Sequence, residues 1–319
     1  MFKIRTLRVG DISKIKGICE NQEIINQINQ NQCNLFLQPL IPYNFRTSPS
    51  IHLAIEESNL LGFVILKCAS KVNNTWQIDH VFVPDELRNE GIGEELIRYV
   101  ISIYGSYGIE NFLAIADSTN SAAISLFQSC GFRKYAKVYY YEKEFDPSME
   151  SENYVPILDK SYTTRQITVN DLTKLEKLEL SSIPPDLRHA LGRSKSYFKE
   201  KKHSILLIDK SRNIIIGWFN INRLTNEHYF VDLLVSPGWT HLYEQLLNIV
   251  IYETISNKSY KIKLTVKVND YFTELTQRLD EMGFLVTQAK DLLVRTVWQR
   301  VKEKKKKLAK FGLPHAAPT

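Results

Sequence analysis

Hydrophobic and polar positions along residues 50–145 follow two different periods, which predicts strands and helices in succession. Apolar runs of strand length recur between turn residues. They cover residues 51–56, 62–68, 76–83 and 112–116. The first two runs flank Ser58-Asn59 and predict a hairpin, and Tyr139-Tyr140-Tyr141 predicts a closing strand.

Between these strands the apolar spacing becomes helical. From Glu94 onward, apolar residues fall three or four positions apart. They are Ile97, Val100, Ile101 and Tyr104. A second helix, capped by Ser118-Thr119-Asn120 and stopped by Gly131, has one apolar face made by Ala123, Ile124 and Phe127. Strands and helices in this order predict an α/β (α+β) domain with a mixed sheet.

The chain contains an internal repeat. Residues 4–15, IRTLRVGDISKI, match residues 164–175, TRQITVNDLTKL, at an offset of 164 − 4 = 160. A later match of Gly131-Phe132 with Gly283-Phe284 has an offset of 283 − 131 = 152, so the second copy is shorter. We therefore expect two tandem domains, each with a central mixed sheet flanked by helices.

The repeat and the local composition set the expected domain boundaries. Residues 1–146 form the first domain and residues 161–300 the second. The segment between them, residues 147–160, is polar and contains prolines, which is typical of a linker. Residues 301–319 form a basic tail.

The net charge of +6 at pH 7 comes from one place. Residues 300–310 hold seven Lys or Arg and one Glu, which gives 7 − 1 = +6 and leaves the rest neutral overall. The body of the protein is therefore not expected to bind nucleic acid. Residues 302–310 have two interpretations: a solvated tail, or an electrostatic contact with RNA, the ribosome or an anionic surface.

The composition, 44% apolar and 24% charged, is that of a soluble globular protein. No stretch approaches the ~20 apolar residues that span a bilayer, and no apolar segment follows the basic N-terminal residues. We expect a cytoplasmic protein with no membrane partner. The four cysteines and seven histidines are not spaced as zinc ligands, so we predict no metal site.

Residues 21–38 are rich in Asn and Gln, and three prolines follow at positions 39, 42 and 49. This composition fits either a solvated, partly helical loop or a lid over a substrate site. Both interpretations stay open, because variable loops have the same composition.

The segment Leu87 to Leu96, LRNEGIGEEL, places Gly91 and Gly93 between a predicted strand and a predicted helix. Glycines let a ligand approach the backbone, and the helix N-terminus adds unpaired N–H groups and the positive end of its dipole. The segment therefore suits a pyrophosphate, with Arg88 at its rim; without a ligand it is a tight turn. Leu96 excludes a dinucleotide fingerprint, and the lack of Gly-Lys-Ser/Thr excludes a P-loop.

The segment Arg88 to Gly93 resembles the Arg/Gln-x-x-Gly-x-Gly/Ala signature of the GNAT acetyltransferase superfamily. Val81-Phe82-Val83-Pro84 is similar to that family's fourth strand, and residues 120–132 resemble its Asn-x-x-Ala … Gly-Phe element. The resemblance implies that acetyl-CoA is the co-substrate and that the loop amides bind its pyrophosphate. The implied coenzyme-binding residues are Val81, Phe82, Val83, Arg88, Asn89, Glu90, Gly91, Ile92, Gly93, Asn120 and Phe127.

The resemblance also implies catalytic roles. The family's base often projects from the fourth strand, at positions that correspond here to Gln77 and Asp79. Asp79 is the candidate base; in the alternative interpretation its carboxylate is hydrogen-bonded to the sheet or a neighbouring loop. A backbone N–H near Val81 to Val83 would polarise the acetyl carbonyl. Many family members have a tyrosine that protonates the leaving thiolate at the position of Phe127, which lacks a hydroxyl.

The second copy lacks the glycine loop. Residues 235–247 read VSPGWTHLYEQLL, without Arg or paired glycines. The eleven steps from Pro84 to Glu95 become eight, and Trp239 would block a ligand. We expect no coenzyme there, as in the degenerate domain of tandem GNAT enzymes. Asp232 matches Asp79 in a copy without coenzyme, which favours a structural role for this carboxylate.

These features predict an N-acetyltransferase that moves an acetyl group from acetyl-CoA to the amine of a small molecule or peptide, directly within a ternary complex. The alternative is a catalytically silent protein, either an acyl-CoA-binding sensor or an interaction scaffold whose basic tail contacts RNA or the ribosome. Phe127 and the non-carboxylate Gln77 keep this alternative open.

Overall fold

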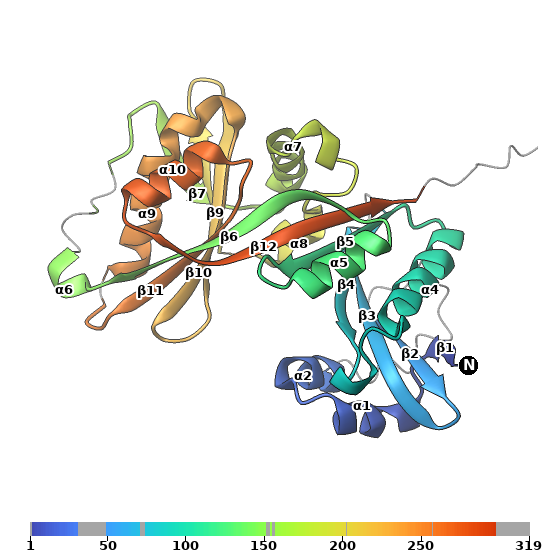
Figure 1. The fold of residues 1–319 in the computed structure, drawn as a ribbon. Coiled ribbons are helices and arrows are strands. Elements are labelled where there is room, and N and C mark those ends of the chain that lie inside the picture. Colours follow the sequence, from blue (N-terminus) through green and yellow to red (C-terminus); the bar gives the residue numbers. More distant parts are fainter. Residues whose placement is uncertain are drawn as a thin grey trace, which may run out of the picture.

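The structure is a computed structural model that describes residues 2–30, 49–70, 74–150, 154, 157–201, 203–256 and 258–297. Within these residues the strands form one mixed sheet of 12 strands, with helices packed against it (Figure 1). The mixed α/β fold expected from the sequence is thus confirmed. In the part of the chain described, no helix is long and apolar enough to cross a membrane.

The first half, residues 2–146, contributes six strands and four of the longer helices to the described structure. The strands are β1 (Lys3–Thr6), β2 (Ser50–Glu56), β3 (Asn59–Ser70), β4 (Thr75–Phe82), β5 (Asn111–Asp117) and β6 (Arg133–Phe145). The helices are α1 (Ile12–Ile18), α2 (Gln22–Gln30), α4 (Ile92–Ser106) and α5 (Ser121–Ser129), with short 3-10 turns η1 (Val9–Asp11) and η4 (Asp85–Leu87). The short helix α6 (Pro147–Glu150) begins the segment predicted as a linker.

The second half, residues 161–297, repeats this order. Its strands are β7 (Tyr162–Gln166), β8 (Ile205–Asp209), β9 (Ile214–Arg223), β10 (His228–Val235), β11 (Ile262–Asn269) and β12 (Leu285–Thr296). Its helices are α7 (Leu172–Ser182), α8 (Lys195–Glu200), α9 (Tyr243–Ile255) and α10 (Thr273–Glu281), with 3-10 turns η6 (Val169–Asp171), η7 (Pro185–Leu187) and η8 (Pro237–Leu242).

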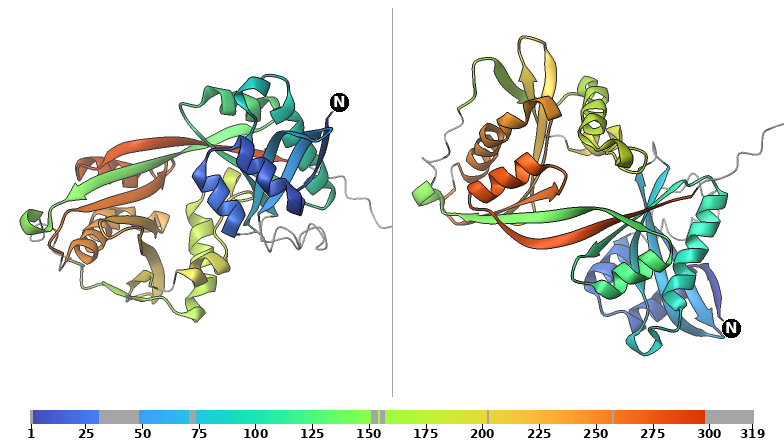
Figure 2. Two further views of the ribbon diagram at one scale, coloured as in Figure 1. Left: turned by 90° about the horizontal axis from the view of Figure 1, so that it is seen from below. Right: turned by 45° about the horizontal axis from the view of Figure 1, so that its top comes forward.

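The two halves exchange their last strands. The sheet order is β1-β2-β3-β4-β5-β12-β6-β11-β10-β9-β8-β7, so β12 lies between β5 and β6. Strand β6 pairs only with β11 and β12 among the described strands, and both belong to the second half. Each exchanged strand also contributes to the core of the other half: Leu293 of β12 lies in the first-half core, and Phe145 of β6 lies in the second-half core. The long strands β6 and β12 cross between the halves in Figures 1 and 2.

Helices cover both faces of each half. In the first half, Ile97 of α4 shares a core with Ile78 of β4, while Ile15 of α1 packs with Phe63 on the opposite face. In the second half, α9 and α10 cover one face and α7 and α8 the other. The segment that follows α7 also reaches the first half, because Leu187 packs in a cluster with residues of β5, β6 and β12.

Two sequence-predicted segments fall largely outside the described residues. Of the polar segment 21–38, the structure describes α2 and ends at position 30; residues 31–38 lie outside it. The basic tail, residues 301–319, also lies outside.

Candidate functional site

Strands β4 and β5 part halfway along β4. Their parallel pairing runs from Thr75 opposite Asn111 to Ile78 opposite Ala114, whereas β4 continues to Phe82. At the same point the pairing of β4 with β3 shifts register, which places Asp79 in a β-bulge. A bulge increases the local twist and bend of a strand, so it accounts for the divergence. The last residues of β4 therefore border a gap in the sheet.

The glycine loop follows this gap. Asn89 and Gly91 both have left-handed backbone angles, with φ of 67° and 81°. Helix α4 then begins at Ile92, and its first hydrogen bond runs from the Glu95 N–H to the Gly91 carbonyl. The N–H groups of Ile92, Gly93 and Glu94 precede that bond and belong to the helix end that has no intrahelical acceptor. Together with the helix dipole they favour an anion.

Gly91 and Gly93 are needed at their positions for different structural reasons. Gly91 adopts the left-handed region, which costs other residues about 1–2 kcal/mol. Gly93 faces α5, where an added Cβ would lie 3.2 Å from Leu126 Cδ2. One glycine therefore shapes the loop, and the other allows α4 to approach α5.

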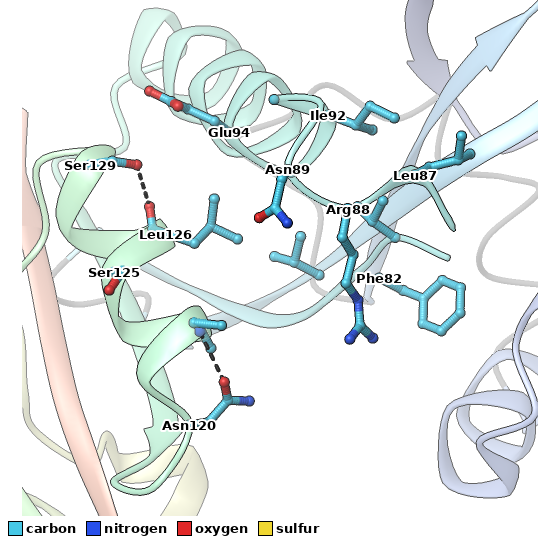
Figure 3. A pocket seen from close by; sticks show the side chains of 16 residues that line it. Phe82, Leu87, Arg88, Asn89, Ile92, Glu94, Asn120, Ser125, Leu126 and Ser129 are labelled. Carbon is cyan, nitrogen blue, oxygen red and sulfur yellow. Dashed lines mark hydrogen bonds between the residues drawn. The ribbon is translucent and has the colours of Figure 1, made fainter. Parts of the chain in front are cut away.

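A cavity of about 600 Å³ lies among the end of β4, the glycine loop and α5 (Figure 3). Its lining residues come from these three elements. They are Val81, Phe82, Val83, Leu87, Arg88, Asn89, Gly91, Ile92, Gly93, Glu94, Asn120, Ala122, Ala123, Ser125, Leu126 and Ser129. The volume is in the range of ligand pockets.

The structure brings together nine of the sequence-predicted coenzyme-binding residues in this cavity. They are Val81, Phe82, Val83, Arg88, Asn89, Gly91, Ile92, Gly93 and Asn120. Asn120 also caps α5, because its side-chain oxygen accepts a hydrogen bond of 2.9 Å from the Ala123 N–H. Arg88 lies at the lip and pairs with Asp85 at 2.5 Å.

Two predicted residues lie elsewhere. Glu90 is in the loop but does not line the cavity. Phe127 is 7% exposed and packs its ring edge-to-face against Phe132, with ring centroids 5.2 Å apart. It lies on the side of α5 that faces the core, so it cannot line the cavity. Seven lining residues were not predicted from the sequence: Leu87, Glu94, Ala122, Ala123, Ser125, Leu126 and Ser129. Of these, Ala122, Ser125, Leu126 and Ser129 follow helical spacing on the other side of α5.

Asp79 lies outside the cavity and already has partners. Its carboxylate is 2.6 Å from the Lys67 ammonium group and accepts a hydrogen bond of 3.1 Å from the Gln77 amide. The side chain is 12% exposed, and the His80 Nε2 is 3.8 Å away. This geometry matches the structural interpretation of Asp79, and it leaves the carboxylate near the divergence of β4 and β5.

The corresponding described segment of the second half, residues 235–247, has no equivalent loop. Turn η8 stands in its place, with Trp239 packed against the second-half core and the Arg212 guanidinium 5.6 Å from its ring centroid. Asp232, which matches Asp79, accepts a hydrogen bond of 2.5 Å from the Tyr197 hydroxyl. Its role in this copy is therefore to hold α8 against the sheet.

Comparisons with known proteins agree with this architecture. Residues 19–132 match the model of the acetyltransferase (GNAT) family. A search of curated proteins found no match. Among solved structures, a GCN5-related N-acetyltransferase from Sphaerobacter thermophilus aligns with a TM-score of 0.60 and 12% identity, covering 92% of this chain and 95% of that one.

Two further structures align over almost the whole chain. A tandem GNAT protein from the clavulanic acid biosynthesis pathway has a TM-score of 0.54 and 11% identity, with 93% of this chain and 98% of that one covered. A putative acetyltransferase from Pyrococcus horikoshii has a TM-score of 0.54 and 12% identity, with 93% and 90% covered. Residues 19–132 therefore match the acetyltransferase (GNAT) family model, and over almost its whole length the chain has the fold of these structures, among them a tandem GNAT protein.

Proposed function

We propose that the protein is an N-acetyltransferase that transfers an acetyl group from acetyl-CoA to an amine, within one ternary complex. The observation that carries this proposal is the cavity of about 600 Å³ where the glycine loop, α5 and the end of β4 meet. The family match covers the same residues and supports acyl transfer. We further propose one coenzyme site per chain, in residues 1–146, and none in the degenerate copy, residues 161–300.

The loop suits the pyrophosphate of coenzyme A. The N–H groups at the start of α4 and the positive end of its dipole favour an anion, and Arg88 adds a cation at the lip. The gap between β4 and β5 leaves backbone at the end of β4 for the pantetheine arm. A backbone N–H there, near Val81 to Val83, would polarise the acetyl carbonyl.

The chemistry needs a neutral amine and a leaving thiolate. The amine nitrogen attacks the carbonyl carbon, a C–N bond forms, the C–S bond breaks and coenzyme A leaves. An alkylammonium with a pKa near ~10 must first lose a proton, and Asp79, directly or through water, is the proposed acceptor. An incoming ammonium group can take the place of Lys67 at this carboxylate.

The thiolate has no tyrosine beside it in the described cavity lining. A thiol pKa of ~8.5 makes thiolate a tolerable leaving group near neutral pH. Phe127, which packs in the core, takes no part in this step. We therefore expect slow but measurable turnover.

Two measurements test the proposal. Acetyl-CoA should raise the thermal unfolding temperature of the purified chain, and acetylated products should appear by mass spectrometry across panels of amines and peptides. If acetyl-CoA does not raise the unfolding temperature, the result contradicts the proposal and leaves only the interaction scaffold as an explanation.

The second candidate function is a silent acyl-CoA-binding sensor. Two observations favour it: the missing tyrosine hydroxyl and the ion pair that occupies Asp79. Stabilisation by acetyl-CoA without any acetylated product would support this sensor and contradict the enzyme.

A further inference from the structure

A second cavity, of about 320 Å³, lies between the two halves. The first half contributes Ala69 of β3 and Leu113 of β5, and the second half contributes residues between positions 190 and 200. Leu113 pairs with Gln77 in the sheet, and Gln77 donates a hydrogen bond to Asp79. We call this space the interhalf cavity. Asp79, the candidate base, does not line this cavity, but it lies two residues along β4 from Gln77, the pairing partner of the lining residue Leu113.

The sheet face that carries Asp79 continues under the second half. Tyr140 of β6 and Lys267 of β11 are register partners. Their chain neighbours Tyr141 and Val266 point into the second-half core, so Tyr140 and Lys267 face the opposite side. The Lys267 side chain keeps accessible surface on this face and can reach a ligand, although the protein around it excludes part of the solvent.

Four charged side chains act on the Lys267 ammonium group: Asp232, Arg193, Lys290 and Lys67. Arg193 lines the interhalf cavity, and Asp232 is bonded to Tyr197, which also lines it. Lys267 therefore belongs to the charged surroundings of that cavity.

Three carboxylates of this region have partners: Asp79 with Lys67 at 2.6 Å, Glu179 with Arg193 at 2.7 Å, and Asp232 with the Tyr197 hydroxyl at 2.5 Å. A fourth carboxylate, Glu200, lines the interhalf cavity itself.

The ammonium groups of Lys267 and Lys290 are not part of such pairs in the described residues. Across the described ranges, no carboxylate lies within ion-pair distance of Lys267 or Lys290; the Lys290 amine instead sits 5.3 Å from the centroid of the Tyr140 ring. Loss of solvent around Lys267 lowers the pKa of its amine, the repulsion of nearby cations lowers it further, and Asp232 opposes both. An anion placed between the two lysines would relieve this repulsion.

We propose that the acceptor carries an acidic group besides its amine, a carboxylate or a phosphate, and that Lys267 and Lys290 bind this group beside the interhalf cavity. The inference rests on the acetyltransferase function proposed above. It assigns the second half a role in acceptor recognition, because Lys267 and Lys290 both come from it. Charge-assisted hydrogen bonds to two ammonium groups give an anion both affinity and orientation.

The first test measures anion binding directly in the full wild-type chain. An amine-reactive reagent labels lysines, and mass spectrometry measures the rate at each position with succinate, phosphate or chloride at equal ionic strength. Succinate or phosphate should slow labelling of Lys267 and Lys290 relative to chloride, and should leave the exposed control Lys261 unchanged. The anion that protects at the lower concentration identifies the preferred group. Equal rates in all three salts, or equal protection of Lys261, overturn the inference.

The second test compares matched acceptors by release of coenzyme A: β-alanine with β-alaninamide, and phosphoethanolamine with ethanolamine. The acidic member of one pair should have a kcat/KM at least about tenfold higher. The double variant Lys267→Gln/Lys290→Gln should lose this preference and keep its activity on the neutral member, whereas Lys261→Gln should retain the preference.

The outcomes separate the two proposals. Turnover of acidic and neutral members at equal kcat/KM overturns the anion site and leaves the acetyltransferase function standing. Protection of Lys267 and Lys290 without any binding of acetyl-CoA overturns the acetyltransferase function and leaves the anion site. A double variant that keeps the preference for the acidic member also overturns the inference.

Discussion

At the scale of single residues, Gly91 tests the coenzyme loop most sharply. Its φ of 81° lies in the left-handed region, which strains an alanine, although an added Cβ would meet nothing within 4 Å. Gly91→Ala therefore introduces backbone strain of about 1–2 kcal/mol without a clash. Relief of that strain moves the loop amides, so the Kd for acetyl-CoA, measured by titration calorimetry, should rise about tenfold.

Gly238→Ala is the matched control for that substitution. Gly238 lies in η8, at the corresponding place in the second half, with open space around it and no left-handed angle. Its substitution should leave the Kd for acetyl-CoA unchanged. Equal effects of the two substitutions, or none from Gly91→Ala, would contradict a coenzyme site at residues 88–93.

Asp79 allows a separate test of the chemistry. Asp79→Asn removes a proton acceptor but lies outside the cavity lining, so kcat at neutral pH should fall about a hundredfold while the Kd for acetyl-CoA holds. The rate of coenzyme A release with an amine that the protein acetylates gives kcat, and titration calorimetry gives the Kd for acetyl-CoA. Asp159→Asn, in a turn at the end of the predicted linker, is the control. A kcat within twofold of wild type would assign Asp79 to the structure alone.

Residue roles differ in how far the sequence predicts them. The glycine loop was predictable because its backbone geometry requires residues without a side chain, and Gly91 and Gly93 show this requirement in the sequence itself. The burial of Phe127 depends on which side of α5 meets the sheet, and the motif alone does not fix that. The pairing of Asp79 with Lys67 depends on the register of β4 against β3 and on a bulge, neither of which leaves a signal in either strand.

At the scale of elements, the repeated opening of each half has a definite cause. Arg5 forms two hydrogen bonds, of 2.6 and 2.8 Å, with the Asp11 carboxylate, and Arg165 forms two of 2.7 Å with Asp171. Both carboxylates also accept the backbone N–H at the start of their 3-10 turn. The pair fixes the first strand of each half to its first helix. The sequence showed the repeat, and the structure shows the interaction it preserves.

This pair predicts a pH dependence of stability. Hydrogen bonds from Arg165 and Thr168 hold the pKa of Asp171 well below its ordinary value. A pKa lowered by folding gives stability that is present above the unfolded pKa of ~3.9 and is lost as the pH falls below it. Asp171→Asn should lower the free energy of unfolding by about 1–3 kcal/mol at pH 7.

The pH series distinguishes this ion pair from a packing effect. Urea unfolding gives the free energy of unfolding of the wild type and of Asp171→Asn. The difference between these two free energies should be smaller at pH 3 than at pH 7, because only the wild type loses the contribution of the ionised Asp171. The exposed Asp186→Asn is the control and should track the wild type. A difference that stays constant across this range would contradict the assignment.

At the scale of the whole molecule, the exchange of β6 and β12 makes the halves interdependent. A fragment of residues 1–156 lacks β12, which leaves β5 with an open edge and β6 without either described partner. Unpaired strand edges favour aggregation. The fragment should not unfold cooperatively as a monomer in thermal scans, and co-expression with residues 157–319 should restore a complex that binds acetyl-CoA.

A cut in the linker gives the control for this prediction. A protease site introduced within residues 151–156 of the full chain should leave the two cleaved pieces associated in size-exclusion chromatography. A monomeric fragment 1–156 with the wild-type Kd for acetyl-CoA would show that the first half needs no strand from the second.

The repeat predicted two copies of one fold, and the structure confirms that fold over the chain. The joined sheet was not predictable from the same pattern. The apolar residues of β6 and β12 identify strands but not which edge each one pairs with, because that choice depends on contacts far apart in the sequence. The domain limits at 146 and 161 stay a prediction, and the sheet and both cores join residues on either side of them.

We expect one coenzyme site per chain, in the first half. Titration calorimetry of the full chain with acetyl-CoA tests it most directly, because it counts sites without knowledge of the acceptor. One acetyl-CoA should bind per chain. Two equivalent sites per chain, or no binding at millimolar acetyl-CoA, would contradict it.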